Sequence, residues 1–213
     1  MIRNFLYGVV VGWVLGLLFL FNAAGCSASY DEELINNSMA IVHAAPSRGS
    51  GVHIGGGIVA TACHVIDDAL GNGGRIWIEG LDGKRSESNA AYCAGGDLAF
   101  VHASDPTIFG DEMQVVDLAD GLGRGCMYGA PGPSDQLIEV CSPFSSGERG
   151  VMFLGRSVLH GMSGGPCVAG DGYAVVVGVI SRTWYRHGHE NDLGTGRTLC
   201  VPVDVSQIRK AFP

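Results

Sequence analysis

Residues 160–168 read HGMSGGPCV and place one hydroxyl, that of Ser163, between glycines. A serine hydroxyl becomes a strong nucleophile only when a base takes its proton, and that base needs an acceptor that fixes its tautomer. The chain offers both residue types beside apolar runs, since His64 ends the word TACH and Asp97 begins the word DLAF. We therefore predict a site in which Ser163 attacks, His64 moves the proton and Asp97 orients His64.

The glycines beside Ser163 suit a reaction in which a carbonyl oxygen gains negative charge. Backbone N–H groups aimed at such an oxygen stabilise the transition state. Gly161 permits a backbone conformation that a residue with a Cβ resists, and Gly164 and Gly165 let the chain pack closely behind the nucleophile. This setting points to acyl transfer.

The elements that must position these residues are predicted to be short strands. The 213-residue chain is 46% hydrophobic and contains 34 glycines, which favours tight turns over long helices. Short apolar runs separated by turn residues are typical of a β-sandwich or barrel. The runs are MAIVHA, GVHIGGGIVATA, RIWIEG, DLAFVHA, MQVVDLA, RGCMYGA, QLIEVC, VMFLG, PCVAG, YAVVVGVIS and TLCVPV. Only residues 204–212 have a helical pattern, with Val205, Ile208 and Phe212 on one face behind an Asp204 cap.

The words TACH, DLA and GMSGGP, in this order, resemble the trypsin-like serine peptidases of the chymotrypsin fold. The resemblance covers about residues 38–213. It implies an all-β fold of two six-stranded antiparallel barrels with a short C-terminal helix. We expect barrel 1 at about 38–108, barrel 2 at about 113–203 and the helix at 204–212, with the seam between the two halves at 102–112.

The resemblance implies a serine endopeptidase that acts on polypeptides without a metal or cofactor. His64 would be general base and then general acid, Asp97 would orient it, and Ser163 would form the acyl-enzyme. The N–H groups of Gly161 and Ser163 would form the oxyanion hole. Two other classes stay open: a catalytically silent peptidase-fold binding module anchored at the cell envelope, and a membrane-anchored structural protein that docks partners.

Two features bear on activation and specificity. Digestive relatives carry an aspartate before the nucleophile, where this chain has Met162, so activation by N-terminal trimming is not expected. By family position the base of the primary pocket falls at Ser157, which favours apolar or small substrate side chains. One pocket wall falls on GVISRT, in which Ser181 matches a serine that supports the catalytic aspartate. His160 and Arg182 lie nearby, where they either favour an acidic substrate residue or face solvent.

The N-terminus predicts export. Arg3 precedes an uncharged apolar run at residues 5–21, as in a secretory signal, although its length approaches that of a membrane span. The word AAGC ending at Cys26 resembles the bacterial lipobox, with alanine where leucine is usual. We expect residues 1–25 to be a signal or anchor and 26–37 a linker.

Lipidation of Cys26 would make the protein a lipoprotein of the cell envelope, attached to the membrane through lipid. An uncleaved single N-terminal span and a secreted form are the alternatives, and Cys26 would then be an ordinary small residue. The six cysteines that remain are even in number, so we expect disulfides, with 15 possible connectivities. Buried free thiols are the other interpretation.

Metal ions and nucleic acids are not expected partners. The cysteines include no CxxC pair, which disfavours a zinc site. The word WYRHGHEN at 184–191 contains His187, His189 and Glu190, and a polar loop accounts for it better than a metal site. The formal net charge is −8 and the sequence has no block of Lys or Arg, which argues against nucleic acid as a partner.

Overall fold

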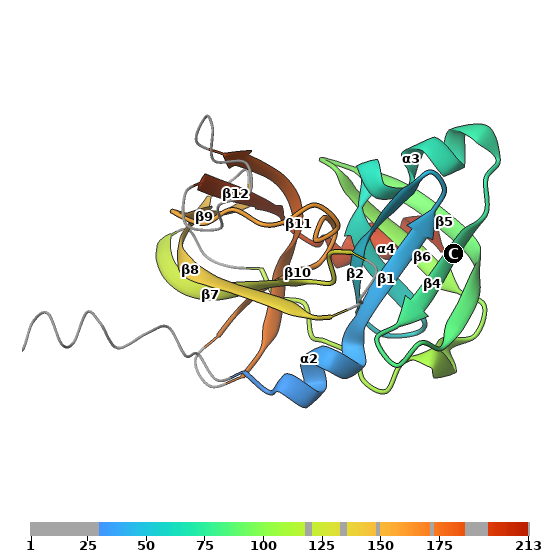
Figure 1. Cartoon of the computed structure of the whole chain (residues 1–213), viewed down its shortest axis with the longest axis horizontal. Coiled ribbons are helices and arrows are strands. Elements are labelled where there is room, and N and C mark those ends of the chain that lie inside the picture. The colour runs from blue at the N-terminus through green and yellow to red at the C-terminus, as the bar shows by residue number, and fades with distance from the viewer. Residues whose placement is uncertain are drawn as a thin grey trace, which may run out of the picture.

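The computed structural model describes residues 30–117, 121–132, 136–147, 150–170, 173–185 and 196–212. Within these ranges twelve strands form two closed, six-stranded antiparallel barrels, which lie side by side (Figure 1). The expected all-β, chymotrypsin-like fold is thereby confirmed. Residues 1–25, which were expected to be a signal or anchor, and Cys26, the expected lipidation site, lie outside the described residues. None of the described helices is long and apolar enough to cross a membrane.

Barrel 1 closes in the strand order β1-β2-β3-β6-β5-β4. Its interior is filled by the inward side chains of alternate residues, such as Val42, Ile78 and Val101, which are fully buried. The strands are β1 (Met39–Ala44), β2 (Ser47–His53), β3 (Ile58–Ala62), β4 (Ile76–Gly80), β5 (Arg85–Gly95) and β6 (Leu98–Ala103).

Barrel 2 closes in the order β10-β11-β12-β9-β8-β7. Met127, Phe153 and Val177 lie in its core. The strands are β7 (Gly121–Gly129), β8 (Ile138–Gly147), β9 (Gly150–Leu154), β10 (Pro166–Ala169), β11 (Val175–Tyr185) and β12 (Gly196–Val201). The chain between the barrels contains a short 3₁₀ helix, η1 (Pro106–Ile108).

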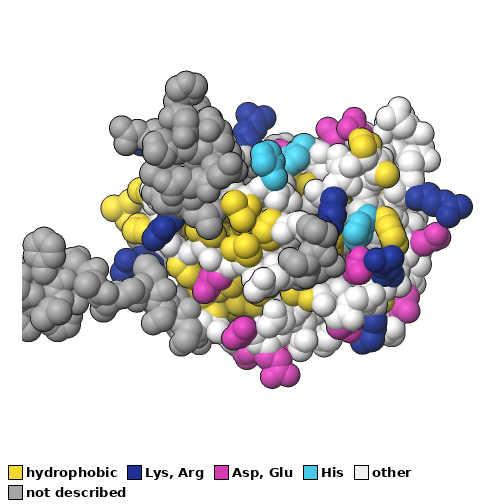
Figure 2. Space-filling model, in the orientation of Figure 1, with side chains coloured by type: hydrophobic (Ala, Val, Ile, Leu, Met, Phe, Trp, Pro, Cys, Tyr) yellow, Lys and Arg dark blue, Asp and Glu magenta, His cyan; other side chains and the backbone are white. Residues whose placement is uncertain are grey.

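A third apolar cluster joins the two barrels. Val52 and Phe100 of barrel 1 are buried in it against Tyr128, Val168 and Val176 of barrel 2. This shared core fixes the position of β2 and β3 relative to β7, β10 and β11. Figure 2 shows one face of the molecule, on which hydrophobic side chains gather over barrel 2 and charges of both signs are spread over barrel 1.

The expectation that only residues 204–212 are helical was wrong. Helix α2 (Glu32–Ser38) occupies the expected linker, where Asp31 caps it by accepting bonds from the amides of Glu33 and Leu34. Helix α3 (Cys63–Asn72) follows β3 and ends at Gly73, whose φ of 65° is left-handed.

The expected C-terminal helix is present as α4 (Val205–Ala211), with Asp204 as its cap. Although the chain arrives from barrel 2, α4 lies behind barrel 1 (Figure 1). There the ring of Phe212 meets that of His102 at 5.7 Å between centroids. The end of the described chain therefore returns from barrel 2 and packs against barrel 1.

Two strand assignments also need correction. The word MQVVDLA was expected to be a strand, but of its described residues, 113–117, only Val115 pairs, in an isolated parallel bridge with Val176. Conversely, β5 was not expected, because its sequence RSESNAAYCAG lacks an apolar run. It forms because β4 and β6 both pair with it and close the barrel.

The expected disulfides are confirmed. Cys63 pairs with Cys93, Cys126 with Cys141, and Cys167 with Cys200. The first lies in barrel 1, and the other two lie in barrel 2. Structural disulfides persist in oxidising compartments, so the three bridges indicate an exported protein.

Candidate functional site

Asp97 and His64 meet at the edge of barrel 1. Asp97 lies in the turn between β5 and β6, and it is the only non-glycine residue in the described ranges with a positive φ, at 71°. This strained turn directs the carboxylate toward α3. Its Oδ1 accepts from the His64 backbone N–H at 3.0 Å, and its Oδ2 lies 2.9 Å from His64 Nδ1.

Helix α3 presents His64 in its first turn. Ala62, at the N-cap, has no side chain that can bond the free amides, so the Asp97 carboxylate takes the place of a cap. The Cys63 N–H also donates to the Asp97 carbonyl at 2.9 Å, and the disulfide to Cys93 ties the start of α3 to β5. Local backbone bonds and one covalent bond therefore hold the pair together.

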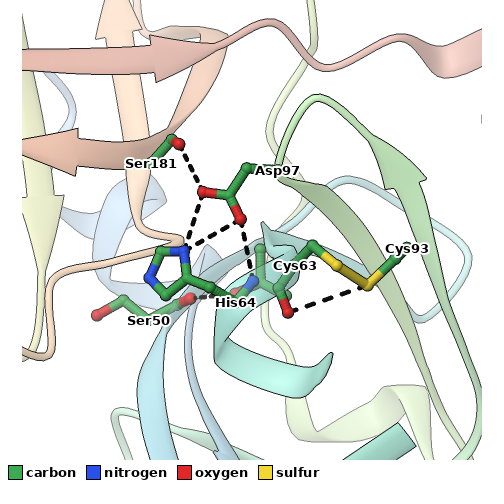
Figure 3. A network of polar contacts seen from close by, with 7 residues as sticks. Ser50, Cys63, His64, Cys93, Asp97 and Ser181 are labelled. Carbon is green, nitrogen blue, oxygen red and sulfur yellow. Dashed lines mark hydrogen bonds and ion pairs between the residues drawn. A yellow bond between two sulfur atoms is a disulfide. The ribbon is translucent and has the colours of Figure 1, made fainter. Parts of the chain in front are cut away.

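Ser181 of β11 extends the pair across the barrel junction. Its hydroxyl donates to Asp97 Oδ2 at 2.5 Å, and the residue is buried. Figure 3 shows the resulting chain from Ser181 through Asp97 to the His64 ring. Because Nδ1 faces a carboxylate, it carries the proton, and Nε2 keeps a lone pair on the side away from Asp97.

The electrostatics of the site keep Asp97 charged. Burial disfavours the carboxylate, but hydrogen bonds from His64 and Ser181 outweigh burial and hold the pKa of Asp97 below its ordinary value. The hydrogen bond to Asp97 raises the pKa of His64 above 6.5, against the opposing effect of partial burial. The charge of Asp67 also raises the pKa of His64, whereas that of Arg182 lowers it.

Ser163 reaches the same junction from barrel 2. Its carbonyl accepts from the Ser50 N–H of β2 at 2.7 Å, and the next amide, that of Gly164, donates to the Ile180 carbonyl of β11 at 2.7 Å. Gly164 lies against Ala62, two residues before His64. The half-buried Ser163 and the His64 ring thus come from segments in contact. Among the described residues, no hydrogen bond joins the Ser163 hydroxyl to that ring.

The loop before Ser163 contains two amides that bond no acceptor among the described residues. Gly161 has a φ of 91°. The Met162 N–H donates to the Leu159 carbonyl at 3.1 Å. Within the described ranges, the N–H groups of Gly161 and Ser163 make no hydrogen bond to the protein. These are the two groups expected to form the oxyanion hole.

Met162 holds this loop from inside barrel 2. It is fully buried, and a Cβ on Gly129 would lie 2.7 Å from its Cα, which leaves no room for a larger residue there. Its Sδ accepts from the Leu159 N–H at 3.4 Å, a distance at which a thioether can act as a weak acceptor. The position directly before Ser163 is therefore held by apolar packing inside barrel 2.

The expected pocket residues occupy different settings. Ser157 is fully buried, and a Cβ on Gly196 of β12 would lie 2.9 Å from its Cβ. His160 and Arg182 are exposed. The hydroxyl of Ser181 donates to Asp97.

A metal site finds no support in the described residues. The loop with His187, His189 and Glu190 lies outside them. Among the described residues, one cluster of possible metal ligands occurs. It combines Glu139 with Cys126 and Cys141, whose sulfurs are bonded to each other. A disulfide offers no thiolate to a metal ion.

No family model matches the chain, and no curated protein matches its sequence. Solved structures do match. The serine protease of a human pathogenic astrovirus is 18% identical, with a TM-score of 0.58, 84% of this chain covered and 94% of the other. A serine endoprotease from Yersinia pestis is 20% identical, with a TM-score of 0.56, and the match covers 84% of this chain and 62% of the other. An inactive form of a Mycobacterium tuberculosis protease is 19% identical, with a TM-score of 0.58 and coverage of 87% and 98%. The chain therefore shares the fold of serine proteases.

Proposed function

We propose that the protein is a serine endopeptidase that uses Ser163, His64 and Asp97. The observation that carries the proposal is the hydrogen-bonded chain Ser181–Asp97–His64, which spans both barrels. Gly164, next to Ser163, packs against Ala62, two residues before His64. A half-buried carboxylate that orients a partly exposed imidazole near a serine fits general-base activation of a nucleophile.

In the proposed reaction, His64 Nε2 takes the Ser163 proton as Oγ attacks the peptide carbonyl. The N–H groups of Gly161 and Ser163 bond the oxyanion, and Asp97 stabilises the imidazolium. His64 then protonates the leaving amine, which leaves an acyl group on Ser163. Water, activated by the same histidine, releases the second product. Since Met162 is already packed in place, no N-terminal trimming is needed to form the loop.

Reaction with a fluorophosphonate probe tests the proposal. We expect the purified domain, residues 27–213, to be labelled once, on Ser163, and Ser163→Ala to remain unlabelled. Ser146→Ala is the matched control and should label like the wild type, because Ser146 lies on β8 away from the site and bonds the Gly121 carbonyl. If wild type and Ser163→Ala were both silent, the activated serine would be refuted, and a binding module would be favoured instead.

The acid limb of kcat/KM should follow the titration of His64. We expect kcat/KM for a neutral peptide to rise through one ionisation with a midpoint above about 6.5, because the bond to Asp97 raises the pKa of His64. Arg182→Gln removes a charge that lowers this pKa, so the midpoint moves up. Asp67→Asn removes a charge that raises it, so the midpoint moves down. Shifts in the same direction for both variants would contradict this assignment.

We also propose a substrate class and a location for the protein. The substrate is a polypeptide, with Ser157 at the base of the primary pocket and His160 and Arg182 at its rim. The export indicated by the disulfides fits a protein held at the cell envelope by lipid on Cys26. Mass spectrometry of the native N-terminus would identify that modification.

A further inference from the structure

Ser50 connects barrel 1 to the loop of Ser163 by two hydrogen bonds and to Ala130, which follows β7, by a third. It lies in β2 with no exposed surface. Its hydroxyl donates to the Gly161 carbonyl at 2.8 Å and accepts from the Ala130 N–H at 3.0 Å. Its own N–H donates to the Ser163 carbonyl at 2.7 Å. Nothing in the sequence singled this serine out.

These bonds fix the peptide group that lies between the Gly161 and Ser163 amides, the two expected to form the oxyanion hole. The peptide that joins Gly161 and Met162 is held at its oxygen by the Ser50 hydroxyl and at its N–H by the Leu159 carbonyl. The peptide before it carries the Gly161 N–H, and the peptide after it carries the Ser163 N–H. Holding the central peptide therefore sets the direction of both neighbours, which is what a preorganised oxyanion hole requires.

The backbone of Ser50 is anchored independently. Its carbonyl accepts from the Thr61 hydroxyl of β3 at 2.7 Å, so the residue is held by barrel 1 as well as by its contacts with barrel 2. The hydroxyl thus works from a rigid strand rather than from a loop. A group on a rigid support can keep a catalytic geometry within narrow limits.

We propose that Ser50 is a positioning residue for the oxyanion hole: its hydroxyl orients the Gly161 amide from the opposite barrel. The proposal rests on the proposed function. It assigns to the barrel junction a role in transition-state stabilisation, so the relative position of the barrels determines turnover as well as stability.

The test compares Ser50→Ala with Ser86→Ala. Ser86 is the matched control, because it is also a buried barrel 1 serine whose hydroxyl donates to one carbonyl, that of Glu87, and accepts from one amide, that of Asp105. We expect Ser50→Ala to lower kcat between about 10- and 100-fold with KM changed by less than about threefold. Ser86→Ala should keep kcat within about twofold of wild type, because the hydroxyl of Ser86 bonds Glu87 and Asp105 and not the loop of Ser163.

The affinity for a peptide aldehyde inhibitor distinguishes a positioning role of Ser50 from a purely structural one. The hemiacetal oxygen of the bound aldehyde occupies the oxyanion site, so in Ser50→Ala the inhibition constant should rise by the same factor as kcat/KM falls. Ser50→Cys, whose thiol is a weaker donor of similar size, should fall between wild type and Ser50→Ala. An unchanged aldehyde affinity, or equal losses of kcat in Ser50→Ala and Ser86→Ala, would overturn the proposal.

Amide hydrogen exchange separates this proposal from the proposed function. Exchange in residues 159–166 should be faster in Ser50→Ala than in Ser86→Ala, whether or not the protein turns over a substrate. If the wild type neither reacted with the fluorophosphonate nor cleaved peptides, the proposed peptidase function would be refuted, but the positioning role of Ser50 would not. Equal exchange of this segment in the two variants would refute the positioning role of Ser50.

Discussion

Asp97→Asn is expected to lower kcat about 10⁴-fold while the protein still folds. Asparagine has the shape of aspartate and adopts left-handed backbone readily, so the φ of 71° at this position remains accessible. The effect should therefore appear in steady-state turnover and in the rate of fluorophosphonate labelling. Thermal unfolding should change little by comparison.

The size of the effect follows from the donors around the carboxylate. The backbone N–H of His64 points at Oδ1 and cannot turn away, so the amide oxygen of the introduced asparagine must take that position. Its NH₂ group then takes the place of Oδ2, beside His64 Nδ1 and the Ser181 hydroxyl, which can rotate to accept. An NH₂ facing Nδ1 favours the tautomer that is protonated on Nε2. In that tautomer His64 cannot accept the Ser163 proton.

Asp67→Asn is the control for the loss of one negative charge. Asp67 raises the pKa of His64 through space without a hydrogen bond to the ring, so its removal should shift the pH profile and leave the maximal kcat nearly unchanged. Equal losses of kcat in the two variants would mean that the charge of Asp97, rather than the tautomer it selects, governs turnover.

The barrels could be predicted from the sequence because most of their strands carry apolar residues at short intervals between turns. Strand β5 escaped prediction because what defines it is pairing with β4 and β6, while its own side chains are largely polar and exposed. Helix α3 begins within the word TACHV, which continues an apolar strand. The buried residues Val65, Ile66 and Ala69 of α3 follow helical spacing. Because an apolar strand directly precedes them, this spacing was read as part of the strand.

The candidate site was predictable to the extent that its residues lie in short words of fixed spacing. The words TACH, DLA and GMSGGP singled out His64, Asp97 and Ser163 as candidates, and the resemblance to trypsin-like peptidases added Ser181. Ser50 lies in an ordinary strand word, GSGVH, and its importance depends on which barrel 2 loop β2 meets. The disulfide pairs likewise depend on which strands become neighbours, as Cys126 and Cys141 do across β7 and β8. Such relations belong to the tertiary fold and leave no local signal.

Gly164→Ala is expected to reduce kcat/KM by about 10²-fold or more and to destabilise the fold by several kcal/mol. Gly164 has a φ of 84°, and a Cβ there would overlap the Ser50 carbonyl and the Thr61 hydroxyl and lie 2.8 Å from the Ala62 nitrogen. Two of these three atoms belong to the backbone of barrel 1, which cannot turn aside. The loop must therefore move away from His64 and carry Ser163 with it.

Gly155→Ala is the control that separates the effect of steric overlap at Gly164 from the effect of placing alanine at a left-handed φ. Gly155 also has a left-handed φ, of 70°, but a Cβ there would meet nothing within 4 Å. Its replacement should cost about 1–2 kcal/mol, as left-handed backbone does for alanine, and leave kcat/KM unchanged. Chemical unfolding of the two variants measures the loss of stability, and steady-state kinetics measures the loss of kcat/KM. A Gly164→Ala enzyme as active as Gly155→Ala would show that the Ser163 loop does not need its close contact with barrel 1.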